Sequence, residues 1–314
     1  MKMHTGYDVI GDIHGCSSSL RLLLDTLDYA MIDGVFRHST RKAIFVGDFI
    51  DRNQDQRGVL DIVRPMIGTG SAMTVMGNHE FNAIAYFTPS PDGNGFLRSH
   101  SKKNIKQHKS FLDTYAAHKS DYADIIDWFK SLPLWLDLDG LRVVHACCDR
   151  SWIQKIYSTY SGNKLTDTLL YNSCQKGCWE YEAIETLLKG KEVPLGFGSS
   201  FYDKDGNKRN HIRIRWWDQN ATTYKKAFIG PETALTHIPD DEIGGHHLVD
   251  YSHSEKPLFI GHYWLHGEPE ILCYNISCVD YSVAKCHGRL AAYRWDGERQ
   301  LSNDKFVWVD RQED

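Results

Sequence analysis

Residues 11–15 are Gly-Asp-Ile-His-Gly, residues 47–52 are Gly-Asp-Phe-Ile-Asp-Arg and residues 77–80 are Gly-Asn-His-Glu. Each of these motifs directly follows a short apolar run, and the runs span residues 7–10, 42–46 and 72–76. Short apolar runs that end at glycine are typical of buried β-strands. The sequence therefore predicts three strands, each with a polar motif at its carboxyl end.

Two amphipathic segments separate the predicted strands. Residues 17–27 place leucines at helical spacing, and Ser17 is suited to cap the first turn. Residues 58–67 show the same spacing, and we expect Pro65 to break the last turn of this helix. Alternating strands and helices predict parallel strands with right-handed crossovers, and such sheets bind ligands at the carboxyl ends of their strands.

The rest of the chain alternates loops, helices and strands. Residues 88–109 are polar and turn-rich and predict a loop that could act as a lid, residues 111–130 predict one or two helices, and residues 134–145 predict a β-hairpin. Residues 150–250 show a helix near 181–188 but no other clean period, so we expect a divergent insertion there. Further strands are predicted at residues 258–260, 271–274, 279–283, 290–295 and 306–309. No linker composition divides the chain, and we expect a single domain over residues 1–314.

Composition excludes several classes of protein. The chain has 314 residues, of which 41% are hydrophobic and 25% charged, values typical of a globular fold that is large enough to need no disulfides. No stretch approaches 18 consecutive apolar residues, so we expect no membrane association. A net charge of −5 does not favour nucleic acid as a partner. The eight cysteines form no disulfide framework and indicate reduced thiols in a cytoplasmic protein.

Six residues that follow predicted strands have side chains that bind divalent metal ions. They are Asp12, His14, Asp48, Asn78, His145 and His262. Carboxylate, imidazole and amide ligands together suit Mn, Fe, Zn and similar ions. Six ligands are too many for one tetrahedral centre, but they match two ions that share a bridging carboxylate. Such a pair holds both the attacking and the leaving oxygen of an in-line displacement.

The order and spacing of these motifs resemble a known family. The three glycine motifs, then His145 after an apolar strand, then Gly261-His262, are similar to the calcineurin-like metallophosphoesterase superfamily. The similarity is greatest to its serine/threonine phosphoprotein phosphatase branch and to the bacterial relatives of that branch. The resemblance implies an α/β fold of four layers, α-β-β-α, in which a central β-sandwich of mixed sheets is flanked by helices.

The resemblance also implies which residues hold which ion. Asp12, His14 and the bridging Asp48 would hold the first ion, and Asp48, Asn78, His145 and His262 would hold the second. Manganese is expected first, with iron, zinc or nickel as alternatives. A hydroxide that bridges the two ions would attack phosphorus directly, without a covalent phosphoenzyme.

Other motif residues would act on the substrate. The resemblance implies that His79 protonates the leaving oxygen while Asp51 orients its imidazole, and imidazole titrates near neutral pH as this role requires. The planar guanidinium of Arg52 would grip the phosphoryl group. The substrate-binding residues are therefore expected to be Arg52, Asn78, His79 and Arg213 or Arg215. We expect the remaining histidines, His108 among them, to lie on the surface or in the lid.

Three departures from the family pattern affect the pocket wall and not the ligands. Asn53 stands where glycine is usual, Cys147-Cys148 stand near a ligand where glycine is usual, and Tyr263-Trp264 follow the last Gly-His. We expect hydrolysis of phosphomonoesters, in phosphoproteins or small phosphate esters, because Asp51 and Glu80 are both present. Two alternatives are hydrolysis of nucleotides of the dinucleoside polyphosphate type and metal-dependent binding without turnover.

Overall fold

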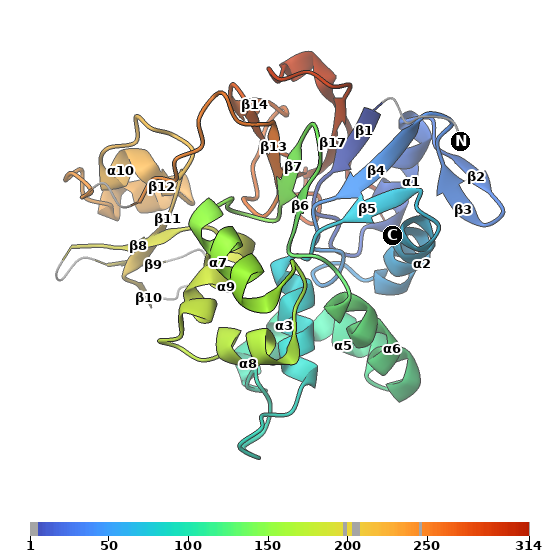
Figure 1. Cartoon of the computed structure of the whole chain (residues 1–314), viewed down its shortest axis with the longest axis horizontal. Coiled ribbons are helices and arrows are strands. Elements are labelled where there is room, and N and C mark those ends of the chain that lie inside the picture. Colours follow the sequence, from blue (N-terminus) through green and yellow to red (C-terminus); the bar gives the residue numbers. More distant parts are fainter. Residues whose placement is uncertain (1–5, 197–199, 203–207, 245–246, 314) are drawn as a thin grey trace.

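Two mixed β-sheets form the centre of the computed structural model, which describes residues 6–196, 200–202, 208–244 and 247–313 (Figure 1). The first sheet has the order β16-β17-β1-β4-β5, with β18 beside β17, and the second has the order β14-β15-β13-β7-β6. The first sheet consists of β1 (Gly6–Ile10), β4 (Arg41–Phe45), β5 (Ala72–Thr74), β16 (Asp280–Tyr281), β17 (Arg289–Trp295) and β18 (Phe306–Asp310). The second consists of β6 (Trp135–Asp137), β7 (Arg142–Val144), β13 (Leu258–Ile260), β14 (Ile271–Cys273) and β15 (Ile276–Cys278).

Within each sheet, the strands that precede the polar motifs pair in parallel with one another. In the first sheet β1 pairs in parallel with β4, and β4 pairs in parallel with β5, as the alternation of strands and helices predicted. In the second sheet β13 pairs in parallel with β7 and with β15. Parallel strands end at the same edge of a sheet, so the motifs that follow them are brought together.

Alternation of side chains along the strands produces the layers. Val9 of β1 and Phe259 of β13 belong to one apolar cluster between the two sheets. Their neighbours Ile10 and Ile260 point to the opposite faces and belong to a second cluster that the helices complete. Because both faces of each sheet are covered, the strands contain nearly continuous apolar runs. The expected four-layer α-β-β-α fold with a central sandwich of mixed sheets is confirmed.

Helices cover the outer faces of the sandwich (Figure 1). The N-terminal half contains α1 (Ser17–Thr26), α2 (Gln56–Gly68), α3 (Asn78–Phe87), α5 (Lys109–Tyr115) and α6 (Lys119–Lys130). The segment beside the second sheet contains α7 (Arg150–Tyr160), α8 (Asp167–Ser173) and α9 (Trp179–Lys189). The Ala146 N–H donates to the Leu187 carbonyl at 2.9 Å, which ties α9 to the loop after β7.

Two helix ends differ from the expectation. Cys16, not Ser17, is the N-cap of α1, and the Ser17 hydroxyl instead donates to Asp55 at 2.5 Å. Helix α2 continues through Pro65 to Gly68. Proline lacks only its own N–H, and its carbonyl still accepts a hydrogen bond from the Thr69 N–H at 3.0 Å, which closes the last turn.

The segments without a clean period contain more regular structure than expected. The predicted loop at 88–109 contains α4 (Lys102–Gln107), where the Ser101 hydroxyl caps the helix by accepting from the Asn104 N–H at 3.3 Å. β15 was not predicted. The remaining short elements are β2 (Ala30–Ile32), β3 (Val35–Arg37), β8 (Glu192–Pro194), β9 (Phe201–Tyr202), β10 (Lys208–Arg209), β11 (His211–Ile214), α10 (Tyr224–Ala227), β12 (Phe228–Ile229), η1 (Glu232–His237) and η2 (Asn303–Lys305). Antiparallel pairing of β8, β11 and β12 gives the region 150–250 a small sheet of its own.

Two further observations concern the cysteines and the helices. None of the eight cysteines, all of which lie in the described residues, forms a disulfide. Within the described ranges, none of the helices combines the length and the apolar character that crossing a bilayer requires.

Candidate metal centre

Backbone hydrogen bonds join the loops that follow the strands. The N–H groups of Ile13 and His14, after β1, both donate to the carbonyl of Asp48, after β4, at 3.1 and 2.9 Å. In the second sheet the Gly261 N–H, after β13, donates to the carbonyl of His145, after β7, at 2.8 Å. Each sheet therefore presents two motif loops as one connected unit.

Several of the motif residues adopt left-handed backbone conformations. The φ values are 48° for His14, 52° for Asp48, 69° for Asp51, 73° for Arg52 and 71° for His262. A non-glycine residue pays about 1–3 kcal/mol in sparsely populated backbone regions, so the surrounding structure must hold it there. Such strained positions are common at functional sites, and here three of the predicted ligands and two neighbouring motif residues adopt them.

Two glycines make room for the ligand carboxylates and the neighbouring backbone. Gly47 has a φ of +98°, and a Cβ at this position would lie 2.4 Å from the backbone nitrogen of Gly77. A Cβ at Gly261 would lie 2.2 Å from Oδ1 of Asp12. Both positions therefore require glycine if the loops are to approach one another.

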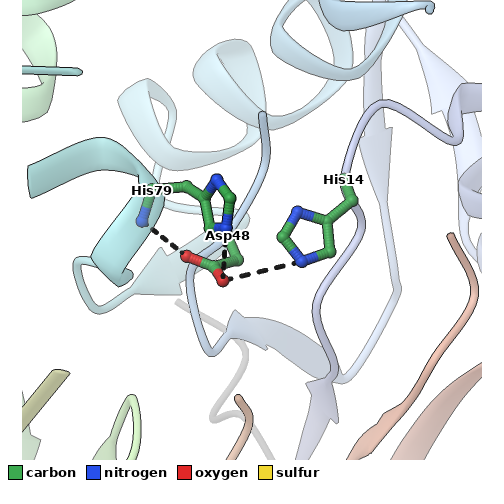
Figure 2. Close-up of side chains that lie close together, drawn as sticks. All are labelled: His14, Asp48 and His79. Atoms are coloured by element: carbon green, nitrogen blue, oxygen red, sulfur yellow. Dashed lines mark hydrogen bonds and ion pairs between the residues drawn. The ribbon is translucent and has the colours of Figure 1, made fainter. Parts of the chain in front are cut away.

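Asp48 lies at the centre of the converging side chains. Its Oδ2 is 3.6 Å from Nε2 of His14, 3.4 Å from Nε2 of His145 and 4.0 Å from Nε2 of His79. Figure 2 shows His14 and His79 on either side of this carboxylate. Two groups of potential metal ligands share Asp48: one adds His14 and His79, and the other adds His145 and His262.

Asn78 and Asp12 lie beside the second group. Oδ1 of Asn78 is 3.2 Å from Nε2 of His145 and 2.7 Å from Nδ1 of His262. Oδ2 of Asp12 accepts the backbone N–H of His262 at 3.0 Å. The structure thus brings together all six residues that the sequence analysis named as ligands.

The buried polar atoms of this cluster fit a cationic occupant. Oδ1 of Asp12 and Nε2 of His14 and of His262 are buried without a hydrogen-bond partner in the described part of the chain. Leaving such a group without a partner costs about 1–3 kcal/mol each, and a divalent cation would satisfy their lone pairs. The mixture of oxygen and imidazole donors suits transition-metal ions.

Backbone carbonyls orient two of the imidazoles. Nδ1 of His14 is 2.9 Å from the Ile50 carbonyl, and Nδ1 of His145 is 2.7 Å from the Val46 carbonyl. A carbonyl accepts a hydrogen bond only from a protonated nitrogen, so each neutral ring carries its proton on Nδ1 and its lone pair on Nε2. The Nε2 atoms are the ones that face Asp48, as metal ligation requires.

Burial and mutual charge effects shift the pKa values of the carboxylates and imidazoles in this cluster. Burial, then Asp280 and Asp48, raise the pKa of Asp12 well above its usual range. Burial would also raise the pKa of Asp48, but the nearby His145 and His79 outweigh it and hold that pKa well below its usual range. Burial lowers the pKa of His14 to about 3, which leaves a neutral imidazole able to bind a metal.

His79 contacts a second carboxylate. Its Nδ1 is 2.5 Å from Oδ2 of Asp51, and its backbone N–H donates to Oδ1 of Asp48 at 2.9 Å. Burial would lower the pKa of His79, but Asp48 and Asp51 outweigh it and raise that pKa. The geometry alone allows two roles for Nε2 of His79, as a metal ligand or as the atom that carries a proton.

The three predicted phosphate-binding arginines do not lie together. Arg52 is exposed and contributes to lowering the pKa of His14, and its guanidinium lies 5.2 Å from the ring centre of Trp264. The charge of Arg213 contributes to lowering the pKa of His262, and Nε of Arg213 is buried without a hydrogen-bond partner in the described residues. Arg215 instead lines a separate cavity of about 480 Å³, none of whose lining residues is a predicted ligand.

Two residues near the centre were not found from the sequence. His108, expected on the surface or in the lid, is only 5% exposed, and its Nδ1 lies 2.9 Å from Oδ1 of Asp51. Asp280 is buried, and its carboxylate accepts the backbone N–H groups of Trp264 and Ser282 at 2.6 and 3.0 Å. Neither lies in a motif, and no local pattern marks either position.

Comparison with known proteins identifies the family. A family model described as "Calcineurin-like phosphoesterase" matches residues 7–283. The chain belongs to the calcineurin-like phosphoesterase family. Membership of this family confirms the resemblance found in the motifs and supports the assignment to the phosphoric ester hydrolases. A dinuclear metal centre is typical of calcineurin-like phosphoesterases.

Curated proteins to which this calcineurin-like phosphoesterase is similar include bis(5'-nucleosyl)-tetraphosphatases. A bis(5'-nucleosyl)-tetraphosphatase PrpE (asymmetrical) of Oceanobacillus iheyensis is 29% identical over 140 residues, 44% of this chain and 54% of that protein. A protein of the same name from Geobacillus sp. is 40% identical over 150 residues, 46% of this chain and 59% of that protein. The chain thus spans a little over half the length of these curated relatives.

Solved structures share the fold. A mutant of a cold-active protein tyrosine phosphatase has a TM-score of 0.53 at 16% identity, over 98% of this chain and 81% of that chain. A protein serine/threonine phosphatase from Saccharomyces cerevisiae has a TM-score of 0.50 at 15% identity, over 99% of this chain and 81% of that chain. At these identities the likeness concerns the fold alone.

Proposed function

We propose that this calcineurin-like phosphoesterase hydrolyses phosphoric anhydrides and esters at a centre of two divalent metal ions. One observation carries the proposal: Asp48 belongs to two groups of potential ligands, one with His14 and His79 and the other with His145 and His262. A carboxylate shared by two ions is typical of two-metal hydrolysis at phosphorus. Asp12 and Asn78 would complete the two ligand sets.

The ligand chemistry favours manganese, with iron, zinc or nickel as alternatives. Carboxylate and amide oxygens favour the harder ions, whereas three imidazoles suit all four metals. Ions bound there would supply positive charge to the phosphoryl oxygens and lower the pKa of bound water.

The chain's own residues would bind the substrate and move the proton. Nδ1 of His79 is held by Asp51 at 2.5 Å, so Nε2 is left to carry the proton to the leaving oxygen. Arg52 would contact the phosphoryl group with its planar set of donors. Arg213 is the second candidate for this contact, because its charge acts on His262 whereas Arg215 lines another cavity.

The substrate proposed is a dinucleoside polyphosphate. The presence of both Asp51 and Glu80 in the motifs favours phosphomonoesters. The names of the relatives, bis(5'-nucleosyl)-tetraphosphatases, support the alternative better than this first choice. Phosphomonoester hydrolysis remains the second candidate, since the same metal centre and the His79–Asp51 pair would serve both reactions.

We also propose that residues 1–314 form one catalytic domain in the cytoplasm. The first sheet supports this, because β1 near the start of the chain pairs antiparallel with β17 near its end, Tyr7 opposite Trp295. Residues 150–250 would then be an insertion within that domain. The free thiols fit a reducing compartment.

A substrate comparison tests the proposed function. The manganese-loaded protein would be incubated separately with diadenosine tetraphosphate and with a phosphoserine peptide. We expect a higher kcat/KM on the dinucleotide, with ATP and AMP as products if cleavage is asymmetrical and two ADP if it is symmetrical. A higher kcat/KM on the phosphopeptide would restore the monoester assignment, and no turnover of either substrate by metal-loaded protein would overturn the proposal.

A further inference from the structure

The carboxylate of Asp51 lies between two imidazoles. Its Oδ2 is 2.5 Å from Nδ1 of His79, and its Oδ1 is 2.9 Å from Nδ1 of His108. The exposed fractions of the three side chains are 3% for Asp51, 9% for His79 and 6% for His108. We propose that His108 is a positioning residue that holds Asp51 and, through it, the proton-donating imidazole of His79, an inference that rests on the proposed role of His79.

His108 belongs to residues 88–109, the segment predicted to be a lid, and the fold places it beside Asp51. His108 lies between α4 and α5, and its backbone N–H donates to the Asn104 carbonyl at 3.0 Å. Its ring stacks on Phe111, with ring centres 4.9 Å apart and planes 28° apart, and lies against Tyr86 at 5.4 Å. These aromatic contacts restrict the rotation of the ring, so its Nδ1 is kept facing Asp51.

Asp51 needs both partners to keep one orientation. Its backbone is held in a left-handed conformation, and its N–H donates to Oε1 of Gln56 at 2.6 Å. With only one imidazole as a partner, the carboxylate could rotate about its Cβ–Cγ bond. A hydrogen-bond donor on each oxygen fixes the plane of the carboxylate. A carboxylate in a fixed plane keeps Oδ2 in line with Nδ1 of His79, which sets the direction of the opposite nitrogen.

The ionised state of the Asp51 carboxylate agrees with its position between two imidazoles. Burial would raise the pKa of Asp51, but the charge and hydrogen bond of His108, together with His79, outweigh it and hold that pKa well below its usual range. An anionic carboxylate accepts hydrogen bonds on both oxygens. The other nitrogen of His108, Nε2, is buried without a hydrogen-bond partner in the described residues, so the polar contact of this ring is the one to Asp51.

Two substitutions separate the hydrogen bond from the packing. His108→Phe keeps an aromatic ring between Phe111 and Tyr86 but removes the donor. His108→Asn loses the ring but places an amide N–H where Nδ1 stands. Comparable thermal unfolding midpoints and metal contents would show that both variants retain the fold and the metal centre.

The kinetic measurement uses two aryl phosphates with manganese-loaded enzyme, p-nitrophenyl phosphate and phenyl phosphate. A poor leaving group depends on protonation, whereas nitrophenolate leaves with little help. We expect His108→Phe to lower kcat on phenyl phosphate about 10–100-fold, part of the 10²–10⁴-fold that a general acid supplies. The loss on p-nitrophenyl phosphate should be several-fold smaller, KM should be unchanged, and His108→Asn should recover most of the rate.

A spectroscopic measurement decides the inference independently of activity. In protein loaded with diamagnetic zinc, the hydrogen bond between His79 and Asp51 should give a low-field proton resonance that His79→Ala removes. We expect His108→Phe to shift or broaden this resonance and His108→Asn to restore it. Equal losses on both aryl phosphates with an unchanged resonance would overturn the role of His108. A wild-type enzyme without turnover would overturn the proposed function instead, and the resonance would still decide whether His108 positions Asp51.

Discussion

The side chain of Glu80 holds the backbone of Asp48. Oε2 of Glu80 accepts the Asp48 N–H at 2.8 Å and the Gly77 N–H at 3.0 Å, while Oε1 accepts the Phe49 N–H at 2.9 Å. Glu80 is fully buried in the first turn of α3. One carboxylate therefore joins the loop after β4, which carries the shared ligand, to the helix that carries Asn78.

Replacing Glu80 tests this connection. An amide oxygen can still accept hydrogen bonds, but the amide nitrogen of Glu80→Gln would face a backbone N–H, so we expect a loss of about 1–3 kcal/mol in the free energy of unfolding. Metal occupancy should also fall, because Asp48 is no longer held. Urea unfolding and elemental analysis measure both effects. The exposed Glu182→Gln in α9 is the control, and an effect no larger than that of the control would contradict the connection.

Asp48 should be indispensable to the centre. Asp48→Asn removes the charge that two cations would share and also weakens the acceptor of the His79 N–H, which lies at 2.9 Å. We expect metal content and phosphoesterase activity to be lost together, whereas the exposed Asp127→Asn should keep both. Full activity without bound metal would show that the ligand cluster is not catalytic.

His79 should separate catalysis from metal binding. If Nε2 carries a proton, His79→Ala should keep both metals and lose about 10²–10⁴-fold in kcat, with the smaller loss on good leaving groups. His14→Ala should instead lose metal, and it provides the matched comparison. Loss of metal in both variants would assign His79 as a ligand, a role that its 4.0 Å distance to Asp48 also allows.

Removing metal should destabilise the protein as well as inactivate it. A ligand present at about 100 times its dissociation constant stabilises the folded state by about 2.7 kcal/mol. Chelation should therefore lower the thermal unfolding midpoint and abolish turnover, and added manganese should restore both. If chelated protein kept its midpoint while losing activity, the ions would be bound too weakly to be part of the folded structure.

Glu255 should make stability depend on pH. The hydrogen bond from Arg142 to Oε2, at 2.6 Å, is the main cause that lowers the pKa of Glu255. A pKa lowered by folding stabilises the folded state above the unfolded pKa of about 4.3, and this contribution is lost as pH falls through the folded pKa.

Glu255→Gln should therefore cost roughly 0.5–1 kcal/mol of unfolding free energy near neutral pH and progressively less in acid, since the pair is partly solvated. Urea unfolding of the variant and the wild type at about pH 7 and about pH 3.5 measures the difference. An equal gap at both pH values would show that the charge of Glu255 is not involved, and Glu182→Gln again serves as the exposed control.

The local sequence was enough to predict the strands of the sandwich apart from β15, and it placed the candidate ligands at the ends of strands. Apolar runs that end at glycine marked β1, β4 and β5, because burial of both faces of a parallel sheet requires continuous apolar residues. The polar residues after these strands were found for the same reason, since strand ends are where the chain leaves the core. The helix over residues 58–67 was predicted, but its continuation through Pro65 was not, because the Pro65 carbonyl still accepts the Thr69 N–H. The helix α4 was not predicted, because its first turn depends on a single capping serine.

Contacts between distant parts of the chain determined the rest. Asp12 and His262 are 250 residues apart and His108 and Asp51 are 57 apart, yet each pair is hydrogen-bonded. The same packing lets the charge of Arg213 act on His262 and puts Arg215 at another cavity, although only Ile214 separates the two in the sequence. Periodicity reports which face of an element is buried, but the partner on that face depends on how the layers and loops pack in three dimensions. For this reason the six candidate ligands could be named from the sequence, whereas the imidazole of His108 behind Asp51 was found only in the tertiary structure.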